Sequence, residues 1–127
     1  MLDFRPNEEQ KMLAETISRY ARERVRKVFR DAEEEGDIPE AVIKAGWEIG
    51  LLPTALPEEY GGFGDYSAVT GALAFEEFAW GDLAVTLEVM TPNLVAIPLL
   101  LCGTEEQKGQ YLPQFCEEAP PKMTAAL

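Results

Sequence analysis

The segment LPEEYGGFGD, residues 56–65, decides how this chain folds, because it places a stiff, glycine-rich loop between two stretches of helical pattern. Pro53 and Pro57 restrict the backbone at its entry. Three glycines follow that permit positive φ or a close backbone approach: Gly61, Gly62 and Gly64. We predict a rigid corner that sets the angle between two helices, with Tyr60 and Phe63 tucked back between helices. We prefer this structural role to direct contact with a ligand.

The residues before this loop predict two helices. Asn7 is a suitable N-cap, and acidic residues follow it in the first turn. Apolar residues then recur at helical spacing: Leu13, Ile17, Tyr20, Ala21, Val25, Val28 and Phe29. This first helix should fade over residues 33–36, where Gly36 provides a C-terminal stop. A second helix is expected over residues 39–49, and Gly50 permits its exit.

The residues after the loop predict two further helices. Asp65 could cap a third helix over residues 66–80, and Asp82 could cap a fourth over residues 83–102. The fourth helix carries only one charged residue, Glu88. A helix that is apolar all round is normally the central, buried one in a soluble chain. We therefore expect this helix to lie in the interior.

A membrane span is the alternative interpretation of residues 83–102, because the run is long enough to cross a bilayer. We disfavour it, since Pro92, Asn93 and Pro98 interrupt the run. Glu88 would also be costly in lipid. Pro92 is expected instead to kink or restart the helix.

The C-terminal part predicts one more helix. Thr104 and Gln107 form a capping box, in which each side chain accepts a backbone N–H of the other residue. The apolar face that follows consists of Tyr111, Leu112 and Phe115. Ala-Pro-Pro at residues 119–121 ends the helix, and residues 122–127 could begin a strand. The predicted fold is therefore all-α, an orthogonal or up-down bundle of five to six helices over residues 1–121.

The composition excludes several functions. With 11 basic against 23 acidic residues the net charge is −12, so nucleic-acid binding is not expected. The nearest basic patch is interpreted as a solvated helix face: Arg19, Arg22, Arg24, Arg26, Lys27 and Arg30. The lack of histidine argues against a zinc site and excludes a Ser–His or Cys–His nucleophile pair within the chain. Two cysteines, Cys102 and Cys116, and a start without a leader pattern indicate a reduced, cytoplasmic compartment.

Three motifs in a fixed order carry a family resemblance. PEEYGGFGD follows a helix ending in GLLP, precedes a helix carrying FEEFA, and is followed downstream by CGTEEQKGQYLPQF. In this order and spacing they resemble the N-terminal domain of the acyl-CoA dehydrogenase family. The opening DFRPNEEQKMLAETISRYARERV is similar to that family's first helix. The resemblance covers essentially the whole chain.

The resemblance implies a flavoenzyme that is larger than this chain. In the family, a helical N-terminal domain packs against a middle β-domain and a C-terminal helical bundle, and FAD lies in the crevice they share. A carboxylate removes the α-proton of an acyl-CoA while the β-hydrogen leaves as hydride to the flavin, which yields the enoyl-CoA. That base usually comes from the C-terminal domain, so we assign no catalytic residue here. The isolated acids are expected to be solvated: Glu58, Glu59, Glu76, Glu77 and Glu88.

The end of the chain resembles the start of the family's flavin-contacting strand. Residues 122–127 would then begin the middle β-domain, and a backbone N–H near Leu127 could reach the FAD. The chain is thus expected to be a fragment that is inactive alone, binds no yellow chromophore and exposes an apolar surface where further domains belong.

The resemblance also places an acyl-chain pocket along the fourth helix. Four residues match the stretch that faces the fatty-acyl chain in relatives: Thr86, Leu87, Met90 and Leu94. An alkyl chain needs an apolar slot, and methionine provides an adaptable wall. Ordinary core packing explains each of these residues equally well.

The resemblance leaves the acyl group open, whether straight, branched or aromatic. It implies electron-transfer flavoprotein as the usual electron acceptor and a homotetramer as the common assembly. Two other functions remain: a non-catalytic docking domain, or subunit of a split flavoenzyme, and a small acyl-lipid carrier.

Overall fold

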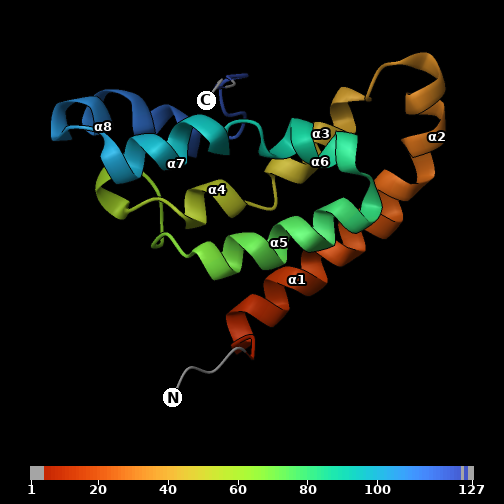
Figure 1. Cartoon of the computed structure of the whole chain (residues 1–127), viewed down its shortest axis with the longest axis horizontal. Helices are drawn as coiled ribbons and strands as arrows, with labels where there is room; N and C mark the ends of the chain where they lie inside the picture. The colour runs from red at the N-terminus through yellow and green to blue at the C-terminus, as the bar shows by residue number, and fades with distance from the viewer. Residues whose placement is uncertain (1–4, 124, 126–127) are drawn as a thin grey trace.

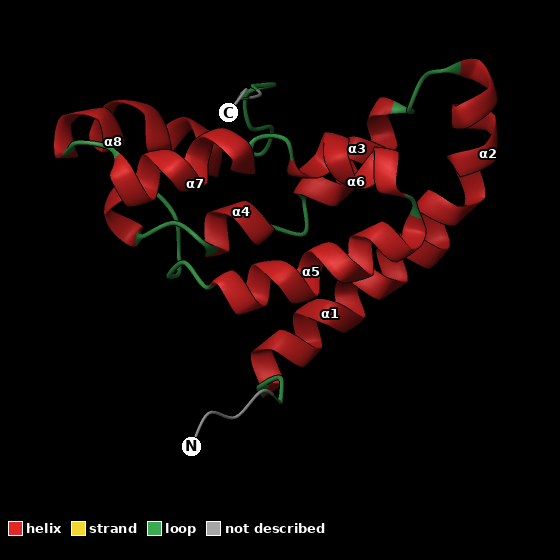
Figure 2. Ribbon diagram, in the orientation of Figure 1, coloured by secondary structure: helices red, strands yellow, loops and turns green. Residues whose placement is uncertain are grey.

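The computed structural model describes residues 5–123 and 125, and this part of the chain is helical without a strand (Figure 2). In chain order the elements are α1 (Glu8–Tyr20), η1 (Ala21–Val25), α2 (Arg26–Glu35), α3 (Glu40–Trp47), α4 (Leu51–Thr54), η2 (Glu58–Tyr60), α5 (Ala68–Gly81), α6 (Leu83–Met90), α7 (Asn93–Cys102), α8 (Glu105–Tyr111) and η3 (Leu112–Cys116). The predicted all-α class is confirmed.

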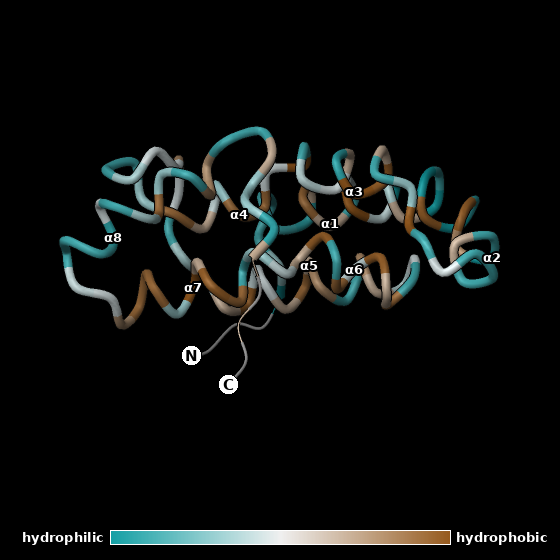
Figure 3. Tube along the Cα trace, turned by 90° about the horizontal axis from the view of Figure 1, so that it is seen from above, coloured by the Kyte–Doolittle hydropathy of each residue, from teal (hydrophilic) through white to brown (hydrophobic). Residues whose placement is uncertain are grey.

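The helices form two layers in an elongated molecule. Seen from above, α5, α6 and α7 run along one long side, and α3 and α4 lie on the other (Figure 3). At one end α2 rises away from the body of the molecule (Figure 1). No single helix in the described part is long and apolar enough to span a membrane, whereas α6 and α7 together have the length and composition but are bent by 45°.

The first predicted helix forms as a rod with an irregular middle. Asn7 caps α1 as predicted, because its side chain accepts the Gln10 N–H (2.8 Å) and the Gln10 side chain accepts the Asn7 N–H (3.0 Å). Gly36 ends α2 in the left-handed region with φ 72°. Between them η1 is a π-turn, which the sequence does not predict. Gly81 packs tightly there, since an added Cβ would lie 3.1 Å from side-chain atoms of η1.

Two apolar cores stabilise the fold. The first joins α1, α3, α5 and α6, and in it Tyr20 packs edge-on against Phe78 with ring centres 5.6 Å apart. The Tyr20 hydroxyl donates to the Val42 carbonyl oxygen at 2.8 Å. The second core joins α4, η2, α7 and η3 around buried Leu56, Leu112 and Phe115. α6 therefore belongs to one core and α7 to the other.

The glycine-rich loop is the rigid corner that its sequence predicts. Gly61 adopts φ +90°. A Cβ added to Gly62 would lie 2.0 Å from the Leu56 carbonyl oxygen, and one added to Gly64 would lie 2.0 Å from that of Thr54. Tyr60 is buried as expected.

The expectation for Phe63 is wrong, because 62% of its surface is exposed. Its N–H donates to the Pro53 carbonyl oxygen at 3.1 Å, which holds this turn of backbone against the body of the loop. The ring is left on the surface and lies over Gly50, where an added Cβ would be 3.7 Å away.

Several predicted boundaries also differ. The third helix begins at Ala68 with Ser67 as its N-cap rather than Asp65, since the Ser67 hydroxyl accepts the Thr70 N–H at 3.2 Å. The second helix ends at Trp47, and Gly50 in the left-handed region starts the separate short helix α4. The final helix ends with η3 at Cys116, before the two prolines.

The predicted kink or restart at Pro92 is confirmed, since the fourth helix is divided into α6 and α7, but the expectation of a central, buried rod is wrong. Asp82 caps α6 as predicted, by accepting the Val85 N–H at 3.0 Å. The chain breaks before α7 at Pro92, which lacks a backbone N–H. Both helices lie in an outer layer and bury only one side (Figure 3).

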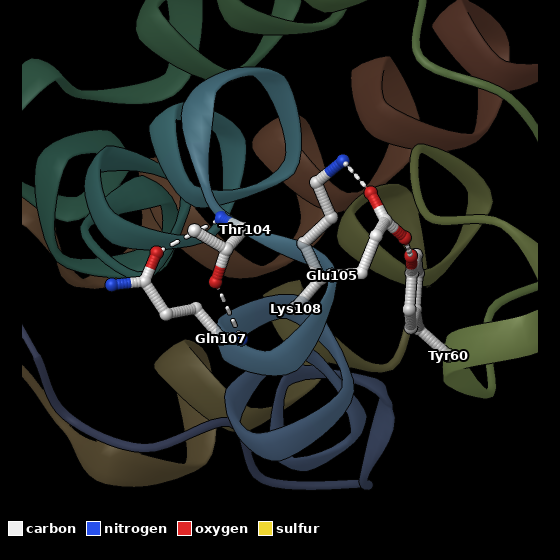
Figure 4. Close-up of polar contacts among 5 residues, drawn as sticks. All are labelled: Tyr60, Thr104, Glu105, Gln107 and Lys108. Atoms are coloured by element: carbon white, nitrogen blue, oxygen red, sulfur yellow. Dashed lines mark hydrogen bonds and ion pairs between the residues drawn. The ribbon is translucent and has the colours of Figure 1, made fainter.

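The predictions for the C-terminal helix and strand can be compared with the structure only in part. Thr104 caps α8 with the predicted capping box (Figure 4). Of its predicted apolar face, Leu112 and Phe115 are buried, but Tyr111 is exposed. Lys122 and Met123 are not in a strand, and most of the remaining predicted strand, Leu127 included, lies outside the described residues.

Candidate functional site

The four predicted pocket residues lie on α6 and α7 but in two different environments. Thr86 and Met90 are buried, with 1% and 7% of their surface exposed. Leu87 and Leu94 are 52% and 48% exposed. The structure therefore separates the set into an inner pair, which belongs to the packed interior, and an outer pair, which is open to a ligand or another domain.

The inner pair supports the helix from behind. The Thr86 hydroxyl donates to the Asp82 carbonyl oxygen at 2.6 Å, so its polar atom is already satisfied. Met90 packs in the first core and lines a small, partly open pocket of about 30 Å³ together with Trp47, Leu51 and Phe78. A cavity of this size holds about one water and not an alkyl chain. An acyl chain therefore has no room behind Met90.

The outer pair belongs to a longer apolar strip, which we call the leucine face: Leu83 and Leu87 on α6, and Leu94 and Leu101 on α7. All four are exposed large hydrophobic residues. Leu83 and Leu87 are one turn apart on α6, and Leu94 and Leu101 are two turns apart on α7. Sequence reasoning missed Leu83 and Leu101, although the seven-residue spacing of Leu87, Leu94 and Leu101 was a usable signal.

A second open feature lies at the start of α5. A groove of about 610 Å³ runs between the start of α1, α4, the glycine-rich loop, the start of α5 and α7. Its polar edge is ordered by two hydrogen bonds. The Gln10 amide donates to the Thr70 hydroxyl at 3.0 Å, and that hydroxyl donates to the Ser67 hydroxyl at 3.0 Å. No residue of this groove was predicted as a site.

One charged cluster clasps the glycine-rich loop to α8 (Figure 4). The Tyr60 hydroxyl donates to Glu105 Oε2 and Lys108 donates to Glu105 Oε1, each at 2.9 Å. The Lys108 bond and then the Tyr60 bond hold the pKa of Glu105 below its usual value. Burial, followed by the bond to Glu105, raises the pKa of Tyr60 to about 12. A carboxylate with both oxygens engaged is a structural clasp rather than a poised base.

The remaining candidates give no second polar site. The five isolated acids are exposed or half-buried: Glu58, Glu59, Glu76, Glu77 and Glu88. Within the described residues, no three His, Cys, Asp or Glu side chains are grouped so that they could hold a metal ion.

This all-α domain exposes apolar side chains on two consecutive helices, and exposed apolar patches commonly mark interaction sites. The family model of the acyl-CoA dehydrogenase N-terminal domain matches residues 7–119. The chain therefore belongs to the acyl-CoA dehydrogenase family, as the resemblance implied.

Individual relatives agree with this assignment. A probable medium-chain specific acyl-CoA dehydrogenase 2, mitochondrial, of Caenorhabditis briggsae is 31% identical over 92% of this chain and 28% of its own length. The probable acyl-CoA dehydrogenase YngJ of Bacillus subtilis is 33% identical over 87% of this chain and 29% of its own length. The chain thus spans less than a third of the curated relatives it matches.

Solved structures show the same fold. Butyryl-CoA dehydrogenase from Megasphaera elsdenii matches with a TM-score of 0.80 at 24% identity, over 92% of this chain and 31% of that one. A chain from a structure described as the electron transferring flavoprotein of Acidaminococcus fermentans matches with a TM-score of 0.78 at 28% identity, again over 92% of this chain and 31% of that one.

Proposed function

We propose that this chain is the N-terminal part of an FAD-dependent acyl-CoA dehydrogenase, which converts an acyl-CoA thioester to the enoyl-CoA. The leucine face carries this proposal, because it is an apolar strip left open in a member of this family. In this arrangement Leu87 and Leu94 contribute to one wall of the acyl-chain slot, and the other wall belongs to the rest of the protein. Residues 1–121 form the domain, and residues 122–127 lead into the next one.

The wall binds by excluding water from an alkyl chain. Each apolar side chain that an acyl chain covers contributes roughly 25 cal/mol per Å² of buried surface. Thr86 and Met90 act indirectly, since both are packed behind the wall and keep α6 in place. This divides the four predicted residues into two that contact substrate and two that position them.

The flavin and the base lie outside the described residues in this proposal. The small pocket of about 30 Å³ beside Met90 cannot hold an isoalloxazine ring. Bound FAD would supply the hydride acceptor, held mainly by the middle domain, with the backbone near Leu127 at its edge. The described residues contribute an apolar surface that excludes water, and Glu105 is already engaged by Tyr60 and Lys108.

The wider setting follows from the same proposal. The substrate is an acyl-CoA, the electron acceptor is an electron-transfer flavoprotein, the assembly is a homotetramer, and the compartment is the cytoplasm. The leucine face does not distinguish straight, branched and aromatic acyl groups, because only one wall is present.

The experiment is a comparison of variants in the full-length product. Leu87→Asp should lower kcat/KM for acyl-CoA about tenfold or more. The loss of a single methylene contact in an apolar pocket already has an effect of that size, and a charge in the slot is at least as unfavourable. Met12→Asp is the matched control, because Met12 is also an exposed apolar residue but lies on α1. The 127-residue chain carrying Leu87→Asp should keep its thermal midpoint, which separates a binding defect from misfolding. Equal activity of the two full-length variants would contradict the assigned wall.

The absorption spectrum of the full-length product tests the reaction. A flavin spectrum that bleaches with one acyl-CoA of a panel would support a dehydrogenase and name its substrate class. A full-length product without flavin would favour the docking domain, and tight fatty-acid binding by the 127-residue chain alone would favour the carrier.

A further inference from the structure

The helix α2 continues the rod of α1 and η1 and has few contacts with the body of the molecule. None of its ten residues is fully buried, and half-buried Val28 packs against the first core. It rises away from the rest of the molecule (Figure 1). The ion pairs of the described residues lie on α1, α3 and α8 and not on α2. Its exposed faces are therefore available to a partner.

An ordered ladder of arginines and aromatic rings runs along this helix. The guanidinium carbon of Arg26 lies 4.8 Å from the ring centre of Trp80 and 5.3 Å from that of Phe29. Arg22 extends the ladder beyond Trp80 at 5.2 Å, and Arg30 extends it beyond Phe29 at 5.9 Å. Stacking occupies guanidinium faces and leaves the N–H edges free to bind carboxylates. The arginines are thus held in place without a charged partner among the described residues.

One face of α2 is complementary to itself. Arg26, Phe29, Arg30 and Glu33 lie at positions i, i+3, i+4 and i+7, so they share one face of the helix. Two such helices placed antiparallel about a two-fold axis bring Arg26 opposite the second copy's Glu33, and Phe29 opposite the second copy's Arg30. Each contact then occurs twice, as an isologous interface requires.

The charge distribution also favours a second copy of this chain as the partner of α2. Residues 19–37 hold six basic and six acidic side chains, with the basic residues first and most of the acidic ones last. This segment is neutral overall, although the chain carries a net charge of −12. Two copies joined here bring the basic end of each segment to the acidic end of the other and keep the remaining negative surfaces apart.

We propose that α2 is a self-complementary docking surface for a second copy of this chain, held by reciprocal Arg26–Glu33 pairs beside the Trp80 ladder. One helix pair is smaller than the interface of a permanent dimer, so the association is weak and sensitive to salt. This assembly is independent of the acyl-chain wall, which lies on α6 and α7.

Sedimentation equilibrium of the 127-residue chain tests the proposal through a charge exchange. At low ionic strength the unaltered chain should show a reversible monomer–dimer equilibrium. Arg26→Glu alone and Glu33→Arg alone should each weaken it about tenfold or more, because each places like charges opposite one another in two symmetric pairs. A one-to-one mixture of the two variants should dimerise again, because opposite charges then face each other in both symmetric pairs.

Matched controls isolate the interface. Lys44→Glu and Glu48→Arg make the same charge changes at exposed positions on and beside α3, and both should leave the equilibrium unchanged. Circular dichroism should show the same helix content in all four variants. The proposal is overturned if the unaltered chain stays monomeric. The proposal is also overturned if Arg26→Glu leaves the association unchanged, which is the result expected for association through the leucine face. A mixture of the two variants that associates no better than either variant alone would overturn it as well.

Discussion

Replacing Gly62 with alanine would place a Cβ 2.0 Å from the Leu56 carbonyl oxygen and 2.8 Å from the Leu56 Cβ. Real Cβ contacts do not fall below 3.0 Å, so the two segments would have to separate by at least about 1 Å. Leu56 is fully buried and cannot move without disturbing the second core. The loop itself must therefore open.

Opening the loop would lower the free energy of unfolding. It would break the Gly62 N–H bond to the Pro57 carbonyl (3.1 Å) and the Gly64 N–H bond to the Leu56 carbonyl (3.2 Å). Each lost hydrogen bond costs about 1 kcal/mol, and residual overpacking adds about 1–3 kcal/mol. We expect Gly62→Ala to lower the free energy of unfolding by about 3–5 kcal/mol, a large part of the total for a domain of this size.

Urea unfolding of the 127-residue chain, followed by circular dichroism, measures this difference. Gly109→Ala is the control, because its Cβ would meet open space within α8. It should stabilise the chain by about 0.5–1 kcal/mol through helix propensity. If Gly62→Ala unfolded within 1 kcal/mol of the unaltered chain, the loop would be a tolerant linker, and the argument that it fixes the corner would be refuted.

Four further predictions concern polar contacts. Tyr60→Phe removes one of the hydrogen bonds that lower the pKa of Glu105. The loss of stability in this variant should be full at neutral pH and should shrink as the pH falls through the titration of Glu105. Unfolding curves measured at acid pH would show this. Because the pKa of Tyr60 is raised to about 12, the unaltered chain should also lose stability as the pH rises from about 10 towards 12, in step with the ultraviolet signal of tyrosinate. Trp47→Phe loses the indole N–H bond to the Val89 carbonyl (3.0 Å) and should cost about 1–3 kcal/mol in urea unfolding. Thr104→Ala should cost about 1 kcal/mol by the same measurement, whereas Thr104→Ser should cost little.

Local signals in the sequence predicted the helix starts well. Asn7, Asp82 and Thr104 all cap helices as expected, because a cap depends on residues within one turn. Ser67 and Asp65 show the limit of such signals. Both are good caps two residues apart, and Ser67 is the one whose hydroxyl accepts the Thr70 N–H, which the local pattern does not reveal.

Burial was predicted less well along residues 83–102. The run 83–102 looks the same in sequence whether its apolar side chains meet their own core or an external partner. Leu87 and Leu94 were therefore placed correctly on the helix pair, but their helices were wrongly expected to be central. The outward stacking of Arg26 on Trp80 was likewise hidden, because the two residues are far apart in the chain.

The break at Pro92 is held by packing on both sides, although Leu87 and Leu94 next to it are exposed. α6 ends in the first core and α7 packs in the second, so the 45° bend between them is held from both sides. Trp47 secures the last turn of α6 through the Val89 carbonyl, and buried Pro92 closes the junction beside the small cavity. An acyl chain lying along Leu87 and Leu94 would cross this junction. The relative direction of the two leucines therefore depends on contacts that no substrate touches, so loosening Trp47 should disturb the wall as well as the stability of the domain.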